Sequence, residues 1–213
     1  MNTIPQDGIL LVYKPSGPTS HDMVALVRRK TGIQRVGHAG TLDPFAEGLL
    51  ILLIGRETTK RQTEFLTMDK TYETVIHFGA KSTTDDLAGT ITTMSCEKKP
   101  SPDDIEKALQ SFLGEIEQLP PNFSAKKIKG RKAYELARKG LIPDLKPKKV
   151  TILAIDLLDY SWPLLTIRVS VSSGTYIRAL ARDLGKKLEC GAYCEKLIRT
   201  SIGPYLLRDA ISL

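Results

Sequence analysis

The chain has no hydrophobic run long enough to cross a bilayer, which takes about 20 apolar residues. Its N-terminus, residues 1–7, also lacks the basic start and apolar stretch of a secretory signal peptide. These two absences argue against membrane and secreted classes of protein. With 213 residues, the chain can still bury a sizeable core. We therefore expect a cytoplasmic protein that makes no membrane contact.

Cysteine is scarce, with only Cys96, Cys190 and Cys194 in the chain. Three cysteines cannot all pair with one another, and the odd count fits a reducing compartment. The Cys190-x-x-x-Cys194 spacing has no second pair of ligands that would complete a zinc site. A glycine-rich loop that would cradle a phosphate is also lacking. We expect neither a metal nor an organic cofactor.

Acidic residues are nearly missing from one segment, residues 126–149. Its only acidic residues are Glu135 and Asp144, so its local charge is +8, whereas the whole chain carries +7. This segment therefore holds the entire positive excess, which predicts a surface that binds nucleic-acid phosphates. Apolar residues between the charges predict that part of it packs as a helix, and a solvated basic loop is the alternative. The ten basic residues are Lys126, Lys127, Lys129, Arg131, Lys132, Arg138, Lys139, Lys146, Lys148 and Lys149.

Hydrophobic periodicity and turn residues predict the main elements. We expect a helix that begins at Thr19 or Ser20 and ends at Gly32, and further helices at residues 57–66, 101–113 and 177–188. Residues 79–89 have the composition of a polar loop. Strands are predicted at residues 9–13, 49–54, 71–78, 150–158 and 164–171.

The stretch that best indicates chemistry is Gly37-His38-Ala39-Gly40-Thr41-Leu42-Asp43-Pro44. Its two glycines allow a tight loop that presents His38 and Asp43. The apolar run that follows, Leu49–Ile54, would anchor this loop to a core strand, which is a common active-site layout. The alternative is that Asp43-Pro44 marks only a helix or turn start, with Asp43 as N-cap and Pro44 at the first helical position.

The same octamer resembles the catalytic motif of the TruB family of pseudouridine synthases. The second signature of that family, Ser-x-Gly-Thr-Tyr-Ile-Arg, is matched at residues 172–178. Weaker matches are Lys70-Thr71-Tyr72 and residues 197–205, where Ile198 replaces an arginine of the family pattern. The family's acidic loop is matched by Thr84, Asp86 and Gly89, with Thr83 at its first acidic position, and this substitution leaves any local hydrogen-bond role there open.

The resemblance implies a fold and an activity. The fold would be α+β, with a mixed, largely antiparallel sheet flanked by helices and with a basic insertion. Residues 1–213 would form a single catalytic domain without the C-terminal PUA-like domain of many relatives. The enzyme would isomerise uridine 55 in the T-loop of transfer RNA, and its partner would be the T-arm stem-loop. We expect a monomer that needs no guide RNA.

The resemblance also assigns roles to residues. Asp43 would be the nucleophile, Arg178 would pair with it, and Tyr72 would pack on the target uracil. An unfavourable position supports a carboxylate partner for Arg178, because a cation in the first turn of a helix opposes the helix dipole. His38 would contact the extruded nucleotide. Lys14 would support the site, although it could equally be an edge lysine that keeps its charge in water. Lys126, Lys127, Lys129, Arg131 and Lys132 would bind the RNA.

Three other functions are compatible with parts of this pattern. A glycoside hydrolase would also direct a carboxylate at C1′, but it needs a second acid, and no obvious candidate lies near the motifs. An RNA-binding module without activity would need the basic segment but not Asp43. The catalytic subunit of a guide-RNA particle shares the GH-x-GTLDP motif but carries a C-terminal domain, so the short chain favours the stand-alone enzyme.

Overall fold

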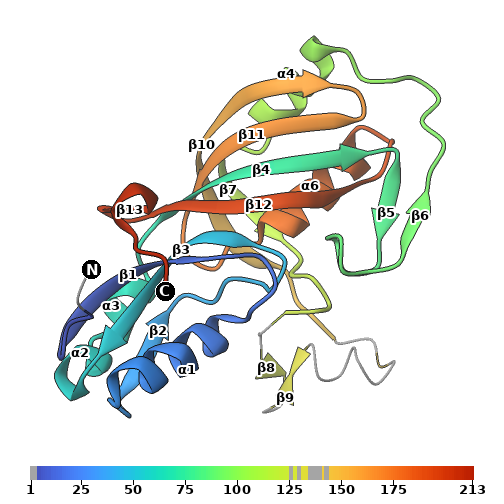
Figure 1. Cartoon of the computed structure of the whole chain (residues 1–213). Helices are drawn as coiled ribbons and strands as arrows, with labels where there is room; N and C mark the ends of the chain where they lie inside the picture. Colours follow the sequence, from blue (N-terminus) through green and yellow to red (C-terminus); the bar gives the residue numbers. More distant parts are fainter. Residues whose placement is uncertain (1–3, 125–126, 129–130, 134–140, 142–143) are drawn as a thin grey trace. The chain divides into compact units, whose positions relative to one another are not determined.

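The computed structural model describes residues 4–124, 127–128, 131–133, 141 and 144–213 (Figure 1). Helices and strands are mixed along the chain, with no regular repeat of a strand followed by a helix. Their bounds are β1 (Gly8–Lys14), α1 (Ser20–Thr31), β2 (Val36–Ala39), β3 (Glu47–Ile54), α2 (Arg56–Lys60), α3 (Gln62–Leu66), β4 (Lys70–Phe78), β5 (Ala80–Ser82), β6 (Ile91–Thr93), α4 (Pro102–Gln110), β7 (Gly114–Gln118), β8 (Lys127–Ile128), β9 (Arg131–Lys132), β10 (Lys148–Ser161), β11 (Leu164–Val171), α6 (Ile177–Lys187), β12 (Ala192–Ile202), β13 (Tyr205–Leu206) and the 3₁₀ helix η1 (Leu207–Asp209).

Within the described residues, nine strands form the main sheet, in the order β1-β3-β12-β4-β11-β10-β7, with β13 paired to β12 and β2 to β3. The pairs of β3 with β1 and β2, and of β10 with β7, are antiparallel, whereas β12 runs parallel to β3. The predicted α+β fold with a mixed, largely antiparallel sheet is therefore confirmed.

The chain divides into two compact units, which are described separately. The first unit comprises residues 1–73, 170–173 and 196–213, and the second comprises residues 74–169 and 174–195. The expectation of a single catalytic domain over residues 1–213 stays a prediction.

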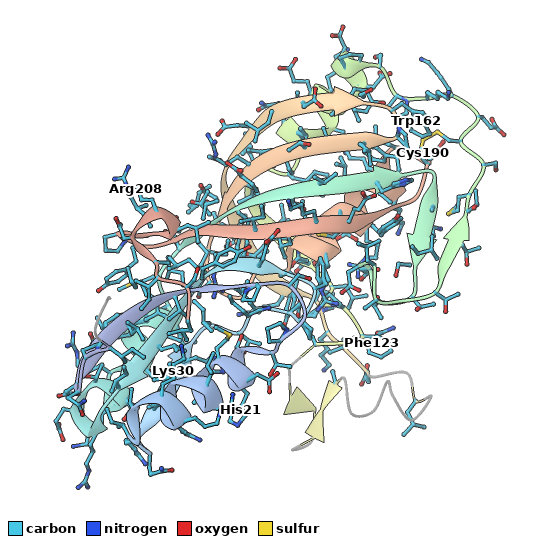
Figure 2. All side chains as sticks on the ribbon, viewed as in Figure 1. His21, Lys30, Phe123, Trp162, Cys190 and Arg208 are labelled. Carbon is cyan, nitrogen blue, oxygen red and sulfur yellow. A yellow bond between two sulfur atoms is a disulfide. The ribbon has the colours of Figure 1, made fainter. Side chains whose placement is uncertain are left out.

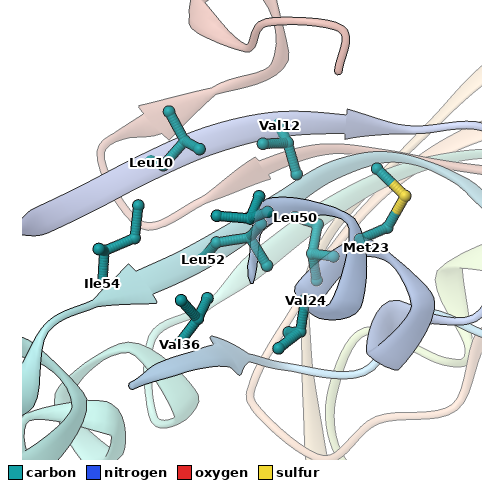
Figure 3. Close-up of a cluster of buried hydrophobic side chains, with 9 residues drawn as sticks. Leu10, Val12, Met23, Val24, Val36, Leu50, Leu52 and Ile54 are labelled. Atoms are coloured by element: carbon teal, nitrogen blue, oxygen red, sulfur yellow. The ribbon is translucent and has the colours of Figure 1, made fainter. Parts of the chain in front are cut away.

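The core of the first unit is built around β3. All residues from Gly48 to Ile54 are buried, so both faces of this strand are covered. Leu50, Leu52 and Ile54 pack with β1 residues and the inner side of α1 (Figure 3). The alternate residues of β3 pack against Phe65 of α3 and Ile202 of β12. Burial on both faces explains why this strand is a continuous apolar run rather than an alternating one.

Helix α1 has the predicted limits. The Thr19 side chain accepts a hydrogen bond from the backbone N–H of Asp22, and Asp22 accepts one from the backbone of Thr19, which completes a capping box. The helix ends at Gly32, which has the left-handed φ of 74°. Its buried side includes Met23, whereas the exposed His21 and Lys30 lie along its solvent side (Figure 2).

The predicted strand at residues 71–78 is confirmed as β4, whose alternate side chains from Tyr72 to Phe78 are buried. The predicted helices near residues 101 and 177 are also present as α4 and α6. The prediction of a simple polar loop at residues 79–89 is partly wrong, because Ala80–Ser82 forms β5 and pairs with β6. His77 has a structural contact, since its ring stacks on Tyr193 with the ring centres 5.2 Å apart.

The basic segment begins with a β-hairpin, in which Lys127 of β8 lies opposite Lys132 of β9. The helix that we predicted for this segment falls mainly on residues 134–140, which lie outside the described residues. Ala133, at the end of the hairpin, is buried. Within the described part of the segment, Ala133 is therefore packed against the rest of the protein.

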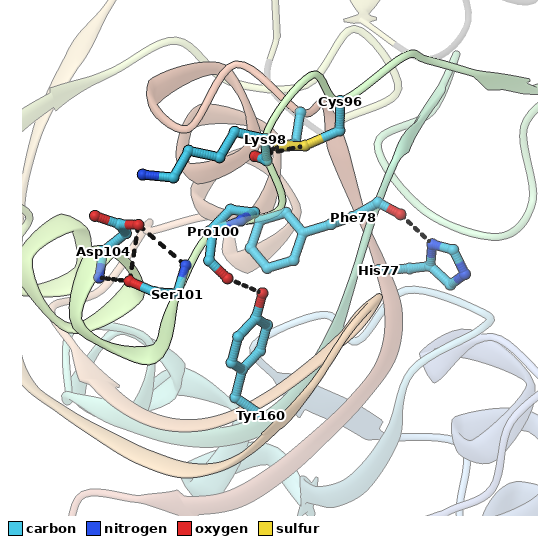
Figure 4. The surroundings of a disulfide bond; sticks show 9 residues. His77, Phe78, Cys96, Lys98, Pro100, Ser101, Asp104 and Tyr160 are labelled. Carbon is cyan, nitrogen blue, oxygen red and sulfur yellow. Dashed lines mark hydrogen bonds between the residues drawn. A yellow bond between two sulfur atoms is a disulfide. The ribbon is translucent and has the colours of Figure 1, made fainter.

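Two of the three cysteines, Cys96 and Cys190, are joined by a disulfide, and Cys194 is buried and free. This pairing departs from the reducing environment that the odd count indicated. The disulfide ties the segment before α4 to the end of α6, and the Ser101–Asp104 capping box begins α4 nearby (Figure 4). Across the described residues, no helix is long and apolar enough to cross a membrane.

Strands β3 and β12 approach closely at Gly48, and this approach generates a stability prediction. Gly48 has φ +110°, and a Cβ there would lie 2.4 Å from the carbonyl oxygen of Arg199. Gly8 has a similar φ of +114° with open space around it, so it is a matched control. We expect Gly8→Ala to cost about 1 kcal/mol of unfolding free energy from backbone strain, and Gly48→Ala to cost at least about 1–3 kcal/mol more because strands must separate. Urea denaturation measures both, and equal losses would contradict the close approach.

Candidate active site

The loop that carries Asp43 runs from the end of β2 to the start of β3. The backbone N–H of Ala46 donates to the carbonyl oxygen of Asp43 at 3.1 Å, so Asp43 begins a tight turn. Of the alternative that Asp43-Pro44 marks a helix or turn start, the turn is therefore present, whereas the helix with Asp43 as N-cap is wrong, because no helix starts at this point of the described chain. His38 lies not on the loop but in β2, where it pairs with Leu52 of β3.

The residues on either side of Asp43 are fixed by the segment that follows β1. The Ser20 hydroxyl accepts a hydrogen bond from the N–H of Leu42 at 2.9 Å and lies 3.2 Å from the carbonyl oxygen of the same residue. The N–H of Gly17 donates to the carbonyl oxygen of Pro44 at 2.8 Å. The backbone is thus held one residue before and one residue after Asp43.

Lys14 lies beneath this loop and is fully buried. Its Nζ donates to the carbonyl oxygens of Pro15 and Pro18, both at 2.8 Å, and of Pro44 at 3.3 Å. Burial lowers the pKa of Lys14 from 10.5 to about 8, and the carboxylate of Asp43 acts in the opposite direction. The alternative of an edge lysine with its charge in water is therefore wrong. Its ammonium and the carboxylate of Asp43 are electrostatic neighbours.

Arg199 of β12 holds the two ends of the same loop, a role that the sequence did not reveal. The side chain is 1% exposed, and its Nε and Nη2 donate to the carbonyl oxygens of Leu49 at 2.8 Å and Gly40 at 3.0 Å. In the sequence it belongs only to the family match at residues 197–205. The available signal is its spacing of two from Leu197, which places both side chains on one face of a strand, and a guanidinium on a buried face needs acceptors.

Lys70, at the start of β4, is buried and, like Arg199, lies next to Gly40. A Cβ on Gly40 would lie 3.8 Å from its Cε, and its Nζ donates to the carbonyl oxygens of Leu66, at 2.9 Å, and Met68. Burial and the positive charge of Arg199 lower the pKa of Lys70 to about 8. Tyr72 lies on the same face of β4 as Lys70 and is 8% exposed.

His38 is partly buried, and its Nδ1 has no hydrogen-bond partner among the residues that the structure describes. Burial lowers the pKa of His38 below its usual value, and the positive charges of His21 and Arg199 lower it further. The imidazole is therefore neutral at neutral pH. Its backbone carbonyl is held by the side chain of Gln62 at 2.6 Å.

Arg178 belongs to the second unit, where it is 3% exposed. Its Nη1 lies 3.1 Å from Oδ2 of Asp86 and donates to the carbonyl oxygen of Thr84 at 2.8 Å. Its Nη2 donates to the carbonyl oxygen of Phe123 at 3.0 Å. The carboxylate partner expected from the helix position therefore exists and is Asp86. The predicted pairing of Arg178 with Asp43 joins residues of different units and stays a prediction.

The loop of Asp86 keeps a local hydrogen-bond network although Thr83 stands at the first acidic position of the family pattern. Oδ1 of Asp86 accepts hydrogen bonds from the Thr84 hydroxyl at 2.6 Å and from the N–H of Ala88 at 2.9 Å. Gly89 lies so close that a Cβ there would be 2.6 Å from the Thr84 hydroxyl oxygen. Thr84 and Asp86 therefore form a local hydrogen-bond network that Gly89 leaves room for, and the Thr83 hydroxyl accepts a separate hydrogen bond from the N–H of Thr90 at 3.0 Å.

The predicted RNA-binding residues are described only in part. Lys127, Arg131 and Lys132 belong to the β8–β9 hairpin, whereas Lys126 and Lys129 lie outside the described residues. Where the structure describes the chain, no group of three or more His, Cys, Asp or Glu residues could hold a metal ion.

Comparison with known proteins places these features in one family. Residues 28–177 match the model of the TruB family pseudouridylate synthase, N-terminal domain. A tRNA pseudouridine synthase B of Protochlamydia amoebophila is 43% identical over 206 residues, which cover 97% of this chain and 78% of that protein. A protein of the same name from Dechloromonas aromatica is 44% identical over 207 residues, which cover 97% of this chain and 69% of that protein.

Two solved structures have a fold similar to that of this chain. The crystal structure of a Cbf5–Nop10–Gar1 complex matches with a TM-score of 0.76 and 27% identity, over 98% of this chain and 53% of that chain. The structure of an H/ACA RNP bound to a substrate RNA containing 2′-deoxyuridine matches with a TM-score of 0.72 and 26% identity, over 97% and 51% of the two chains. This chain thus spans about half the length of those chains.

The lowered pKa of Lys14 predicts how stability depends on pH. Between about pH 8 and 10.5 the unfolded chain binds more protons at Lys14 than the folded chain does, so its contribution to the unfolding free energy rises with pH. We expect the wild type to gain about 1–3 kcal/mol relative to Lys14→Met over this range. Urea denaturation of both proteins from pH 7.5 to 10.5 measures the difference. A constant difference would mean that Lys14 has an ordinary pKa in the folded protein.

Proposed function

Because the chain belongs to the TruB family of pseudouridylate synthases, we propose that it converts uridine 55 in the T-loop of transfer RNA to pseudouridine. The enzyme class follows from the family, and the two relatives above are named as tRNA enzymes. The observation that carries the proposal is the fixed loop of Asp43. Its backbone is held on both sides, and its carboxylate has the Lys14 ammonium as an electrostatic neighbour.

The reaction requires a base to be taken out of the stack. Extrusion of a nucleotide costs a few kcal/mol, which aromatic stacking and phosphate contacts offset. The bond between C1′ and N1 of uracil then breaks, the detached base turns, and a bond forms between C1′ and C5. N1 gains a proton and C5 releases one, so the mass of the nucleotide does not change.

Asp43 is the proposed nucleophile. A carboxylate acts in this role only when ionised, and a neighbouring cation favours the ionised form. Lys14 supplies such a cation from beneath the loop. Tyr72 is proposed to stack on the target uracil, and His38, which is neutral, to contact the extruded nucleotide.

Arg178 is proposed to orient the carboxylate of Asp43. A guanidinium must have a defined orientation to do so, and Asp86 together with the carbonyl groups of Thr84 and Phe123 gives it one. The close ion pair with Asp86 also compensates the charge of a residue that is nearly inaccessible to water. Asp86 is therefore proposed as a positioning residue for Arg178.

The RNA-binding surface is proposed to include the basic residues Lys126, Lys127, Lys129, Arg131 and Lys132, whereas the fully buried Lys14 is proposed to support the Asp43 loop from beneath. Lys127, Arg131 and Lys132 belong to two paired strands, and cationic residues are the ones that contact the phosphate oxygens of a nucleic acid. We further propose that the enzyme acts in the cytoplasm as a monomer, without a metal, an organic cofactor or a guide RNA.

Replacement of Asp43 tests the proposed reaction. We expect Asp43→Asn to lower turnover by at least about 1,000-fold, because the amide keeps the shape of the side chain but is not a nucleophile. The measurement is tritium release from a T-arm stem-loop labelled at C5 of the target uracil, with the Kd for the same RNA measured in parallel. Asp103→Asn, at an exposed position of α4, is the matched control and should react as the wild type does.

Each outcome of that assay has a clear meaning. Release by the wild type and the control, with intact RNA binding by Asp43→Asn, supports the proposal. Appreciable release by Asp43→Asn removes Asp43 from the nucleophilic role. An RNA-binding module without activity would show binding by all three proteins and release by none, from the stem-loop and from full-length transfer RNA alike.

Neutralisation of the basic segment tests the RNA surface. We expect the triple variant Lys127→Gln, Arg131→Gln, Lys132→Gln to bind the stem-loop more weakly. The negative slope of log K against log salt should become less steep by about 2, because fewer counterions are released. The control replaces the exposed Lys98, Lys107 and Lys186 of the second unit with glutamine, which should leave the slope unchanged. An equal change in both variants would contradict the assignment of the RNA-binding surface to the β8–β9 hairpin.

A further inference from the structure

Arg199 is buried on β12 outside both signature motifs, yet its described side-chain hydrogen bonds go to the two segments that flank Asp43, at Gly40 before it and at Leu49 of β3 after it. Its Nη2 binds the carbonyl oxygen of Gly40, where the loop begins, and its Nε binds that of Leu49, just after the loop joins β3. One planar guanidinium therefore joins the two ends of the loop. This fork geometry is specific to arginine, because a lysine ammonium is a point charge.

The backbone brings Arg199 to this position. Arg199 lies opposite Gly48 in the parallel pairing of β12 with β3. A Cβ on Gly48 would lie 2.7 Å from the backbone nitrogen of Arg199 and 2.4 Å from its carbonyl oxygen, so only glycine permits this approach. At the other end, a Cβ on Gly40 would lie 3.5 Å from Nη1. The guanidinium therefore lies in close contact with the loop backbone at the residue where the chain leaves β2.

The remaining contacts of the loop complement those of Arg199. Ser20 and Gly17 hold the residues that flank Asp43, and Lys14 binds the carbonyl oxygen of Pro44. These contacts fix the middle of the loop, whereas Arg199 fixes its ends. A loop whose ends are joined loses most of its conformational freedom before substrate binds.

We propose that Arg199 is a positioning residue for catalysis, which sets the place of the Asp43 carboxylate by joining Gly40 to Leu49. This inference rests on the proposed role of Asp43. Arg199 needs no contact with the RNA for this function, and its burial leaves it little opportunity for one. A shift of about 1 Å in a reacting group is enough to lower the rate of a reaction by about 100-fold.

The test is Arg199→Lys, which keeps the charge and removes the fork, with Arg208→Lys as the control. Arg208 has a side chain that is 80% exposed and projects from the surface near η1 (Figure 2). We expect Arg199→Lys to lower kcat about 10- to 100-fold with KM within about twofold, since the effect is on the reacting group and not on RNA binding. The control should leave both constants unchanged. Circular dichroism at the assay temperature establishes that each variant is folded.

Hydrogen exchange provides a readout that does not depend on activity. Peptides that cover residues 40–49 should exchange faster in Arg199→Lys than in the wild type, whereas peptides from α1 should not change. Unchanged exchange in residues 40–49 overturns the role of Arg199 directly. Faster exchange with unchanged kcat means that Arg199 stabilises the loop without positioning Asp43 for catalysis, which overturns the inference and leaves the role of Asp43 to the Asp43→Asn assay. If Arg199→Lys does not fold, Arg199→Gln retains an N–H donor and is evaluated by the same two measurements.

Discussion

Main-chain carbonyl groups, rather than carboxylates, accept the hydrogen bonds of the buried cations in the first unit. Lys14, Lys70 and Arg199 each donate to two or more of these groups, and none has an ion pair among the described residues. A carbonyl group satisfies the hydrogen-bonding need of a cation without neutralising its charge. The same contacts also fix loops, because each carbonyl belongs to a specific backbone position. The same three side chains therefore fix the loops and keep their positive charge.

Burying these cations around the Asp43 loop has a cost, which is seen in the lowered pKa values of Lys14 and Lys70. Burial is the main cause, the charge of Arg199 lowers both pKa values further, and the carboxylate of Asp43 opposes the change at Lys14. An anion reduces the cost, and two anions are available in the proposed reaction: the carboxylate of Asp43 and the phosphates of the RNA. The buried cation Lys14 thus favours the ionised form of Asp43, which the proposed role of Asp43 requires.

Much of the fold follows from local pattern. Thr19, Asp22 and Gly32 define α1 through capping alone, and the apolar run at residues 49–54 identifies a strand covered on both faces. Local pattern does not predict strands that depend on pairing with a distant segment. Strand β5, for example, is too short and polar to be predicted without its partner β6. The Cys96–Cys190 disulfide is a similar case, because its two sulfurs are 94 residues apart in sequence and no local rule selects that pair.

The catalytic candidates show the same limit at the level of single side chains. Asp43 and Arg178 stand in motifs, whereas the roles of Lys14 and Arg199 depend on carbonyl groups that no residue type identifies. For Arg178, helix electrostatics correctly required a carboxylate, but this argument gives no means of choosing between Asp43 and Asp86. The choice is not exclusive: a guanidinium has five N–H donors. The bond to Asp86 and the bonds to two carbonyl groups therefore orient Arg178 without preventing a second carboxylate from binding to it.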